Sequence, residues 1–114
     1  PLLHELMQSS QSTQSFLTAS AYTTFKMLGS GLSKEEVATI RKLKVNTVED
    51  HLVEIVSNVP DYPIDVYVNR WEIEQIEQAI SSNETKQLRT IKQALPSEVT
   101  YFKIRLVMAK MKEV

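Results

Sequence analysis

The chain has 114 residues, and its 13 lysines and arginines nearly balance its 14 aspartates and glutamates, which gives a formal net charge of −1. This length fits a single domain, and the absence of cysteine excludes a disulfide scaffold, a cysteine-ligated zinc site and a thiol nucleophile. No apolar run approaches the roughly 20 residues of a transmembrane helix, and we therefore expect a cytoplasmic domain without membrane contact.

The first 15 residues are expected to lie outside the folded domain. Leu2, Leu3 and Leu6 can share one helical face, whereas residues 8–15 contain no apolar side chain. We interpret residues 1–15 as a helical stump and a polar linker, and residues 16–112 as the domain. Because the chain begins with Pro1 rather than methionine, we expect it to be a fragment of a longer protein.

Two helices are predicted before residue 42. The first starts near Ser15 or Ser20 and runs to Leu28, where the only two glycines of the chain, Gly29 and Gly31, end it. A serine at position 33 and a glutamate three residues later form a capping box, which predicts the start of the next helix. The expected buried positions of that helix are Val37, Ala38 and Ile40.

A third helix is predicted from a second cap-like pattern at residues 46–49, and Pro60 and Pro63 prevent its continuation. Its expected core positions are Val48, Leu52, Ile55 and Val56. The segment Ile64–Val68 alternates apolar and polar residues, which makes a short strand a weaker alternative to a loop.

The second half repeats this pattern of caps and apolar stripes. Asn69 is a cap-like residue, Trp71 is expected to be a large core anchor, Pro96 ends a helix and Thr100 caps the last one. The predicted stripes are Ile73, Ile76 and Ile80, then Leu88, Ile91 and Leu95, and finally Ile104, Val107, Met108 and Met111. The sequence therefore predicts an all-α fold, a compact bundle of five or six short helices that contains a helix-turn-helix.

The helix-turn-helix is predicted over residues 32–55. A capped helix with a small residue, Ala38, is joined by three or four residues to a second helix, which is the arrangement found in many DNA-binding proteins. The string Glu36-Val37-Ala38, followed by Thr47-Val48-Glu49-Asp50-His51-Leu52, resembles the helix-turn-helix of LuxR-type regulators. It is still more similar to the helicase helix-turn-helix domain at the C-terminus of RecQ-type DNA helicases and of YpbB-like bacterial proteins.

This resemblance covers about residues 20–109. The matching positions also include Ser20, Thr23 or Thr24, Phe25, Gly31-Leu32-Ser33, Arg41, the segment from Ile91 to Pro96 and the segment from Tyr101 to Ala109. The resemblance implies a non-catalytic accessory module of a DNA-processing machine. It also implies DNA as a ligand and a RecQ-type helicase as a partner, in the same chain or in another.

Charges of opposite sign are separated along the chain. Residues 1–44 carry five basic and three acidic residues, residues 45–84 one basic and nine acidic residues, and residues 85–112 seven basic and one acidic residue. The second helix of the pair thus lies in the acidic middle, where Glu49, Asp50 and Glu54 would repel phosphates, although a glutamate can accept a hydrogen bond from cytosine. We expect that this helix does not read bases in the standard way.

The basic C-terminal segment is therefore the main candidate for phosphate binding, supported by residues around the helix-turn-helix turn. The alternative is that this basic face packs against the acidic middle of the same domain. The predicted DNA-binding residues are Lys86, Arg89, Lys92, Lys103, Arg105, Lys110, Arg41, Lys42, Lys44, Asn46 and Thr47.

The acidic helix supports a second hypothesis, a protein-interaction module. Here Glu49, Asp50 and Glu54 would bind a basic surface of a helicase, or the domain would pair with itself. The sequence leaves the oligomeric state open.

The sequence contains no pattern that predicts catalysis, a metal or a cofactor. There is no nucleophile elbow and no glycine-rich phosphate loop. His4 and His51 are far apart and have no cysteine to complete a metal site. We expect His51 to be packed and hydrogen-bonded rather than to bind a phosphate or a partner.

Overall fold

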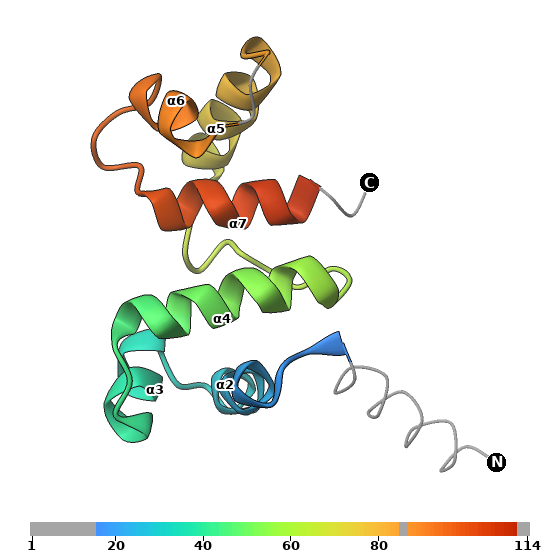
Figure 1. Cartoon of the computed structure of the whole chain (residues 1–114), viewed down its shortest axis with the longest axis vertical. Coiled ribbons are helices and arrows are strands. Elements are labelled where there is room, and N and C mark those ends of the chain that lie inside the picture. The colour runs from blue at the N-terminus through green and yellow to red at the C-terminus, as the bar shows by residue number, and fades with distance from the viewer. Residues whose placement is uncertain (1–15, 85–86, 112–114) are drawn as a thin grey trace, which may run out of the picture.

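A computed structural model describes residues 16–84 and 87–111, and these residues form helices joined by turns and loops (Figure 1). The prediction of an all-α bundle is confirmed, because the described residues contain six helices and no strand. The helices are α2 (Ala19–Gly29), α3 (Lys34–Arg41), α4 (Val45–Asn58), α5 (Arg70–Ser82), α6 (Leu88–Gln93) and α7 (Tyr101–Met111).

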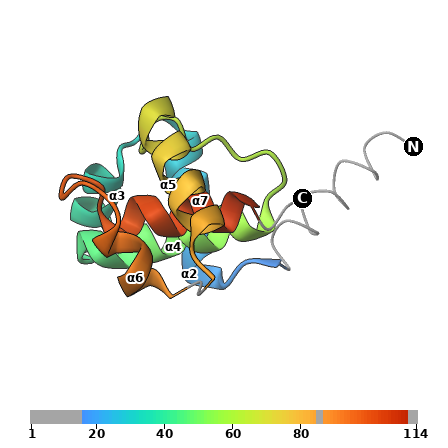
Figure 2. The ribbon, with the colours of Figure 1, turned by 90° about the horizontal axis from the view of Figure 1, so that it is seen from above.

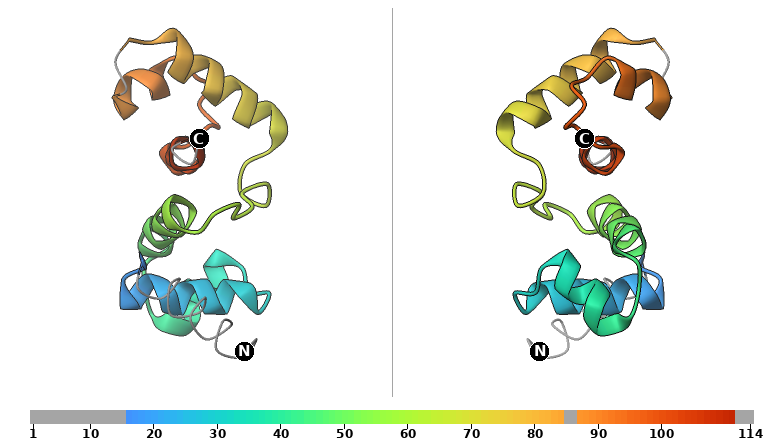
Figure 3. Two further views of the ribbon diagram at one scale, coloured as in Figure 1. Left: turned by 90° about the vertical axis from the view of Figure 1, so that its right-hand side faces the viewer. Right: turned by 90° about the vertical axis from the view of Figure 1, so that its left-hand side faces the viewer.

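The helices are stacked in layers around α4 and α7. In Figure 1, α2 and α3 lie below α4, α7 lies above it, and α5 and α6 cover the far side of α7. Figure 2 shows that α5 crosses α7 at a steep angle, and Figure 3 shows α4 and α7 side by side, nearly end-on. The second helix of the helix-turn-helix is therefore covered on two sides.

Local caps explain where several helices begin. The Ser33 side chain accepts a hydrogen bond from the Glu36 N–H and the Glu36 carboxylate accepts one from the Ser33 N–H, which confirms the predicted capping box. Asn69 and Glu72 form the same reciprocal pair at α5. Thr100 Oγ1 accepts from the Lys103 N–H, as predicted for the cap of α7.

The cap predicted at residues 46–49 is wrong. Lys42 adopts a left-handed conformation (φ 59°) and ends α3, so only three residues separate the two helices. As a result α4 already begins at Val45, and Lys44 occupies the capping position without a side-chain hydrogen bond. Asn46 and Thr47 lie inside the first turn of the helix.

Apolar side chains join the two halves through α4 and α7. The predicted core positions Val48, Leu52, Ile55 and Val56 are fully buried. The buried residues of α7 differ from the predicted stripe, because Met111 at the end of the helix is exposed and Met108 is only partly buried. Further positions are buried instead, since α4 covers one side of this helix and α5 and α6 cover another. The buried residues are Phe102, Ile104, Leu106, Val107 and Ala109.

Two further parts of the sequence prediction are wrong. Trp71 is 52% exposed and is no core anchor, since the inward face of α5 is formed by the Glu72 and Ile76 positions. Ile40 is 59% exposed, because α3 directs Val37 and Ala38 into the core instead.

Residues 64–68 form turns, in which the N–H groups of Tyr67 and Val68 both donate to the Ile64 carbonyl. The loop is therefore confirmed over the strand, which was the weaker alternative.

None of the helices in the described ranges has the length and apolar character that crossing a bilayer requires. The predicted stump and linker lie outside the described residues.

Candidate nucleic-acid interface

A hydrogen-bonded network of side chains holds the three helices of the helix-turn-helix unit together. Arg41, at the end of α3, donates to the Ser20 carbonyl at 2.8 Å, to the Ser20 hydroxyl at 3.1 Å and to Thr24 Oγ1 at 2.6 Å. Thr24 Oγ1 lies 2.7 Å from Nδ1 of His51, on α4. These residues are among those that carry the family resemblance, and their role here is to position α3 and α4 against α2.

The network also holds His51. A guanidinium only donates, so the Thr24 oxygen accepts from Arg41, and the same hydroxyl shares a hydrogen bond with Nδ1 whose direction follows from the tautomer of His51. Burial lowers the pKa of His51, and the positive charge of Arg41 lowers it further against the raising effect of Glu54 and Asp50. The prediction of a packed, hydrogen-bonded histidine is confirmed.

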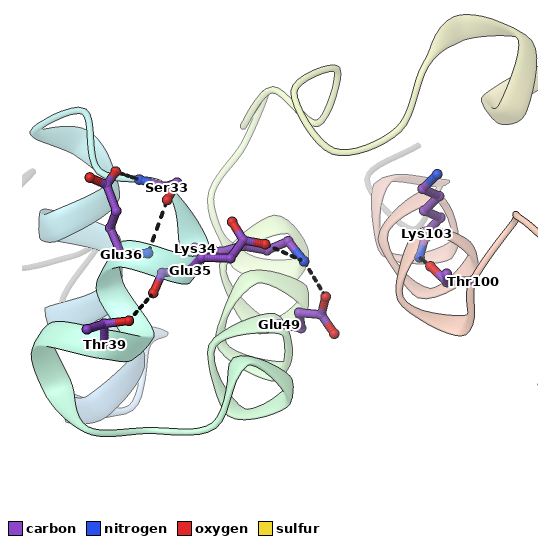
Figure 4. Close-up of polar contacts among 8 residues, drawn as sticks. All are labelled: Ser33, Lys34, Glu35, Glu36, Thr39, Glu49, Thr100 and Lys103. Carbon is purple, nitrogen blue, oxygen red and sulfur yellow. Dashed lines mark hydrogen bonds and ion pairs between the residues drawn. The ribbon is translucent and has the colours of Figure 1, made fainter.

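The acids of α4 are directed to neighbouring elements. Glu49 Oε2 lies 2.5 Å from Lys34 Nζ of α3 (Figure 4). Glu54 accepts from the Thr18 N–H at 2.6 Å and from the Thr18 hydroxyl at 3.2 Å.

Asp50 Oδ1 lies 2.7 Å from Arg105 Nη1 of α7. Each of the three carboxylates predicted to bind a partner therefore has a partner within the chain. Their role in binding another protein stays a prediction. Among the three, only Asp50 has a mostly exposed side chain, at 62%.

Three cations of α7 are likewise held by the fold. Lys103 Nζ lies 2.6 Å from Oε2 of the buried Glu72, and Lys110 Nζ donates to the Tyr62 carbonyl at 2.6 Å. Arg105 makes the ion pair with Asp50. Lys103 and Arg105 of the basic segment therefore pack against the acidic middle of the chain. This is the alternative interpretation of the charge pattern.

Lys103 determines the charge state of Glu72. Burial alone would raise the pKa of Glu72, and it is the largest single influence. The hydrogen bonds from Lys103 and from the Asn69 N–H, together with the charge of Lys103, outweigh it and lower the pKa of this carboxyl. Glu72 is therefore ionised at neutral pH and depends on Lys103 as its counter-ion.

The turn of the helix-turn-helix contrasts with α7. Lys42, Lys44 and Asn46 are exposed, and within the described residues their side chains make no ion pair or hydrogen bond. The two lysines are separated by one residue, at the point where the chain passes from α3 to α4. Thr47 is half-buried beside them. This corner presents two positive charges to solvent.

A second group of predicted residues lies on α6. Arg89 is exposed, whereas Lys92 is half-buried and its ammonium lies 5.9 Å from the centroid of the Tyr101 ring. Figure 1 shows α6 at the opposite end of the molecule from the α3–α4 turn. The predicted residue Lys86 lies outside the described residues. The structure thus divides the described residues of the predicted DNA-binding set into a group at the α3–α4 turn, a group on α6 and a set of cations with internal partners.

The described part of the chain brings no three histidine, aspartate or glutamate side chains together in a way that could hold a metal ion.

Comparisons with known proteins agree with this architecture. Residues 20–108 match the model of a family described as "Helix-turn-helix domain". The chain is also similar to Protein YpbB of Bacillus subtilis (strain 168), with 36% identity over 94 residues. The match covers 82% of this chain but only 27% of the length of YpbB. No solved structure matches the chain significantly. On this evidence, the chain belongs to the helix-turn-helix domain family.

Proposed function

We propose that this chain is a non-catalytic accessory domain that binds DNA mainly through phosphate contacts, with Lys42, Lys44 and Asn46 at the α3–α4 turn as its principal contacts. The observation that carries the proposal is the exposure of both lysines without an internal partner. The three cations of α7, in contrast, are held by carboxylates or by a carbonyl. Free cations neutralise phosphates at the lowest cost, because no existing ion pair has to be broken.

The arrangement favours contact with the DNA backbone over reading of bases. In a standard helix-turn-helix the exposed face of the second helix enters the major groove. Here α7 packs along α4, and Asp50 pairs with Arg105 across that interface. The exposed start of α4 is left to approach DNA, where Asn46 can hydrogen-bond a phosphate oxygen or a base edge. We expect little sequence preference.

Arg89 and Lys92 on α6 provide a second contact in this proposal, together with Lys86. The distance of Arg89 and Lys92 from the turn suits a nucleic acid that runs past both ends of the domain or branches between them. We propose the same partner as the resemblance implies, a RecQ-type helicase in the same chain or in another, acting in the cytoplasm. The family membership and the similarity to YpbB support the helix-turn-helix domain on which this proposal is built, and the helicase partner and the location rest on the resemblance alone.

Fluorescence anisotropy with labelled duplex, forked and single-stranded DNA tests the proposal. The variant Lys42→Glu/Lys44→Glu should weaken binding at low salt by at least about tenfold, and the slope of log K against log salt should fall by about two. Arg70→Glu is the matched control, because Arg70 is almost fully exposed on the acidic helix α5, and its reversal should change affinity by less than about twofold.

Two results would contradict the proposal. One is the absence of salt-dependent binding to any of the three DNA forms. The other is an affinity of the double variant that equals that of the control. Charge reversal of Arg89 and Lys92 then shows which DNA form contacts both the turn and α6. Only that form should lose affinity both in the α6 variant and in the Lys42→Glu/Lys44→Glu variant.

A further inference from the structure

A groove of about 760 Å³ lies where the two halves of the molecule meet. It runs between the start of α3, the loop of residues 59–69 and the start of α7 (Figure 4). Apart from Glu49 and Lys103, none of its lining residues belongs to the predicted DNA-binding or acidic sets. The groove lies at the N-terminal end of α3, whereas the proposed DNA contacts lie at its C-terminal end.

Part of the groove wall is apolar and held in place by packing. The Tyr67 ring meets the Phe102 ring edge-on, with 5.9 Å between their centroids, and the Tyr62 ring packs against Phe25 at 6.0 Å. Val66 projects from the loop with 84% of its surface exposed. A valine left this exposed beside fixed aromatic rings gives a ligand apolar surface to cover. The apolar lining residues are Leu28, Leu32, Tyr62, Pro63, Val66, Tyr67 and Phe102.

Two phenol groups add polar contacts to these walls. Within the described residues, neither the Tyr62 nor the Tyr67 hydroxyl has a hydrogen-bond partner. Burial raises the pKa of Tyr67 to about 12, and the neighbouring Tyr62 and Glu35 contribute to this shift. Both phenols therefore stay protonated at neutral pH and can donate or accept one bond to a peptide group.

The free charge of the groove is negative. Lys34 Nζ lies 2.5 Å from Glu49 Oε2 and 3.5 Å from Glu35 Oε2, and Lys103 is paired with Glu72. Three carboxylates line the groove, those of Glu35, Glu36 and Glu49, together with Lys34 and Lys103. Because Glu72, which lies outside the lining, neutralises Lys103, two net negative charges remain once Lys34 is counted.

Glu35, with 63% of its side chain exposed, holds one of these charges at the rim, and the exposed Asp65 adjoins Val66 in the loop. Phosphates are repelled by this rim, and a cation next to an apolar group is attracted.

We propose that this groove binds a short segment of a partner protein in which a leucine-like side chain stands next to a lysine or arginine. The apolar side chain packs on Val66, Tyr67 and Phe102, and the basic side chain lies at Glu35. The groove already holds a cation in this way within the chain, since Lys34 Nζ lies 4.9 Å from the centroid of the Phe102 ring while it contacts two carboxylates. This inference does not depend on the proposed DNA binding.

The test uses the isotope-labelled full chain and a synthetic peptide of leucine and lysine residues, followed by NMR. Saturable shifts are expected at the amides of Leu32, Glu35, Val66 and Tyr67. A second peptide, with glutamate in place of every lysine, should produce none. Equal shifts with both peptides, or no saturation with the basic peptide at millimolar concentration, would overturn the proposal.

Three substitutions sharpen this test. Val66→Lys and Glu35→Lys both change exposed side chains, so the fold is expected to be kept, and each should raise the Kd of the basic peptide by about tenfold. Glu77→Lys makes the same charge change on an exposed position of α5 outside the groove, and it should change the Kd by less than about twofold.

Equal effects of Glu35→Lys and Glu77→Lys would contradict a specific site. Analytical ultracentrifugation without peptide distinguishes a second occupant, because self-association that Val66→Lys removes would show that another copy of the chain fills the groove. That result would also overturn the proposal. DNA affinity should be unchanged in Val66→Lys, so failure of this inference and failure of the proposed function are separate results.

Discussion

The cations of the α3–α4 turn and those of α7 differ in what they contact. Lys42 and Lys44 face solvent, whereas Lys103 and Arg105 each lie within 2.7 Å of a carboxylate oxygen from another helix. The C-terminal segment of residues 85–112 carries more positive charge in the sequence than the turn does. The two lysines of the turn are nevertheless the ones without internal partners. Availability for binding thus depends on tertiary partners, and local charge density does not reveal it.

The acids of α4 are held by internal partners as well, and one of them, Asp50, pairs with a cation of α7. Through Glu49, Asp50 and Glu54 this helix contacts α3, α7 and the residue that precedes α2. A helix that makes these contacts on several sides is a scaffold for the domain. The predictions below test the comparison by separating residues that stabilise the fold from residues that are free to bind.

Lys103→Met should have the largest effect on stability. It removes the counter-ion of Glu72, which is 5% exposed, and we expect a loss of about 2–3 kcal/mol in the free energy of unfolding. Urea denaturation measures it. Lys42→Met is the control, with an expected change below about 0.5 kcal/mol. Equal losses in both variants would remove the distinction between paired and free cations.

Arg41→Met should have an intermediate effect. Arg41 is adjacent to Lys42 in the sequence, yet it donates to both Ser20 and Thr24. Its loss leaves the buried Thr24 oxygen with one partner fewer, and we expect a cost of about 1–2 kcal/mol. Thermal or urea unfolding of Arg41→Met and Lys42→Met then compares the stability contributions of two neighbouring cations, one hydrogen-bonded and one free. A cost below that of Lys42→Met would mean that the network does not hold the helices together.

Stability should fall when the pH drops below about 6.5. The pKa of His51 is lower in the folded chain than the ordinary value of 6.5, so the unfolded chain takes up the proton first as the pH falls. The stabilisation is complete above about pH 6.5 and is lost as the pH falls toward the lower folded pKa. Urea titrations at about pH 7.5 and about pH 5.5 should show the difference.

The matched variant for this pH dependence is His51→Gln, which cannot titrate. Its stability should change less between the two pH values than that of the native chain, whatever its absolute stability. An unchanged slope would show that His51 is not the group responsible.

The helices and several of their caps could be predicted from the sequence, because these depend on neighbouring residues. The capping pairs Ser33–Glu36 and Asn69–Glu72 are separated by three residues, and the stripe of α4 follows the helical period. The exposure of Trp71 could not be predicted in this way, because it depends on which face of α5 meets α7. A large apolar residue at a helix start is compatible with either face.

The sequence predicted which charged residues belong to the candidate site, but it did not predict which of them have internal partners. Lys103 and Glu72 are 31 positions apart, and Arg105 and Asp50 are 55 positions apart. No local pattern indicates that these side chains meet, since their pairing follows from the packing of α7 against α4 and α5. The groove was missed for the same reason, because its lining comes from four separate segments of the chain.

Arg105→Gln should have the smallest effect on stability. It tests whether a cation in a weak ion pair behaves like a paired or like a free cation. Its ion pair with Asp50 is largely exposed, and such pairs contribute about 0.5 kcal/mol, which salt reduces further. A double-mutant cycle with Asp50→Asn, at low and high salt, measures the coupling.

If Arg105 exchanged Asp50 for a phosphate on DNA binding, Arg105→Gln would lower DNA affinity as much as Lys44→Gln does. If only Lys44→Gln lowers it, even a weak internal ion pair is enough to take a cation out of the binding surface.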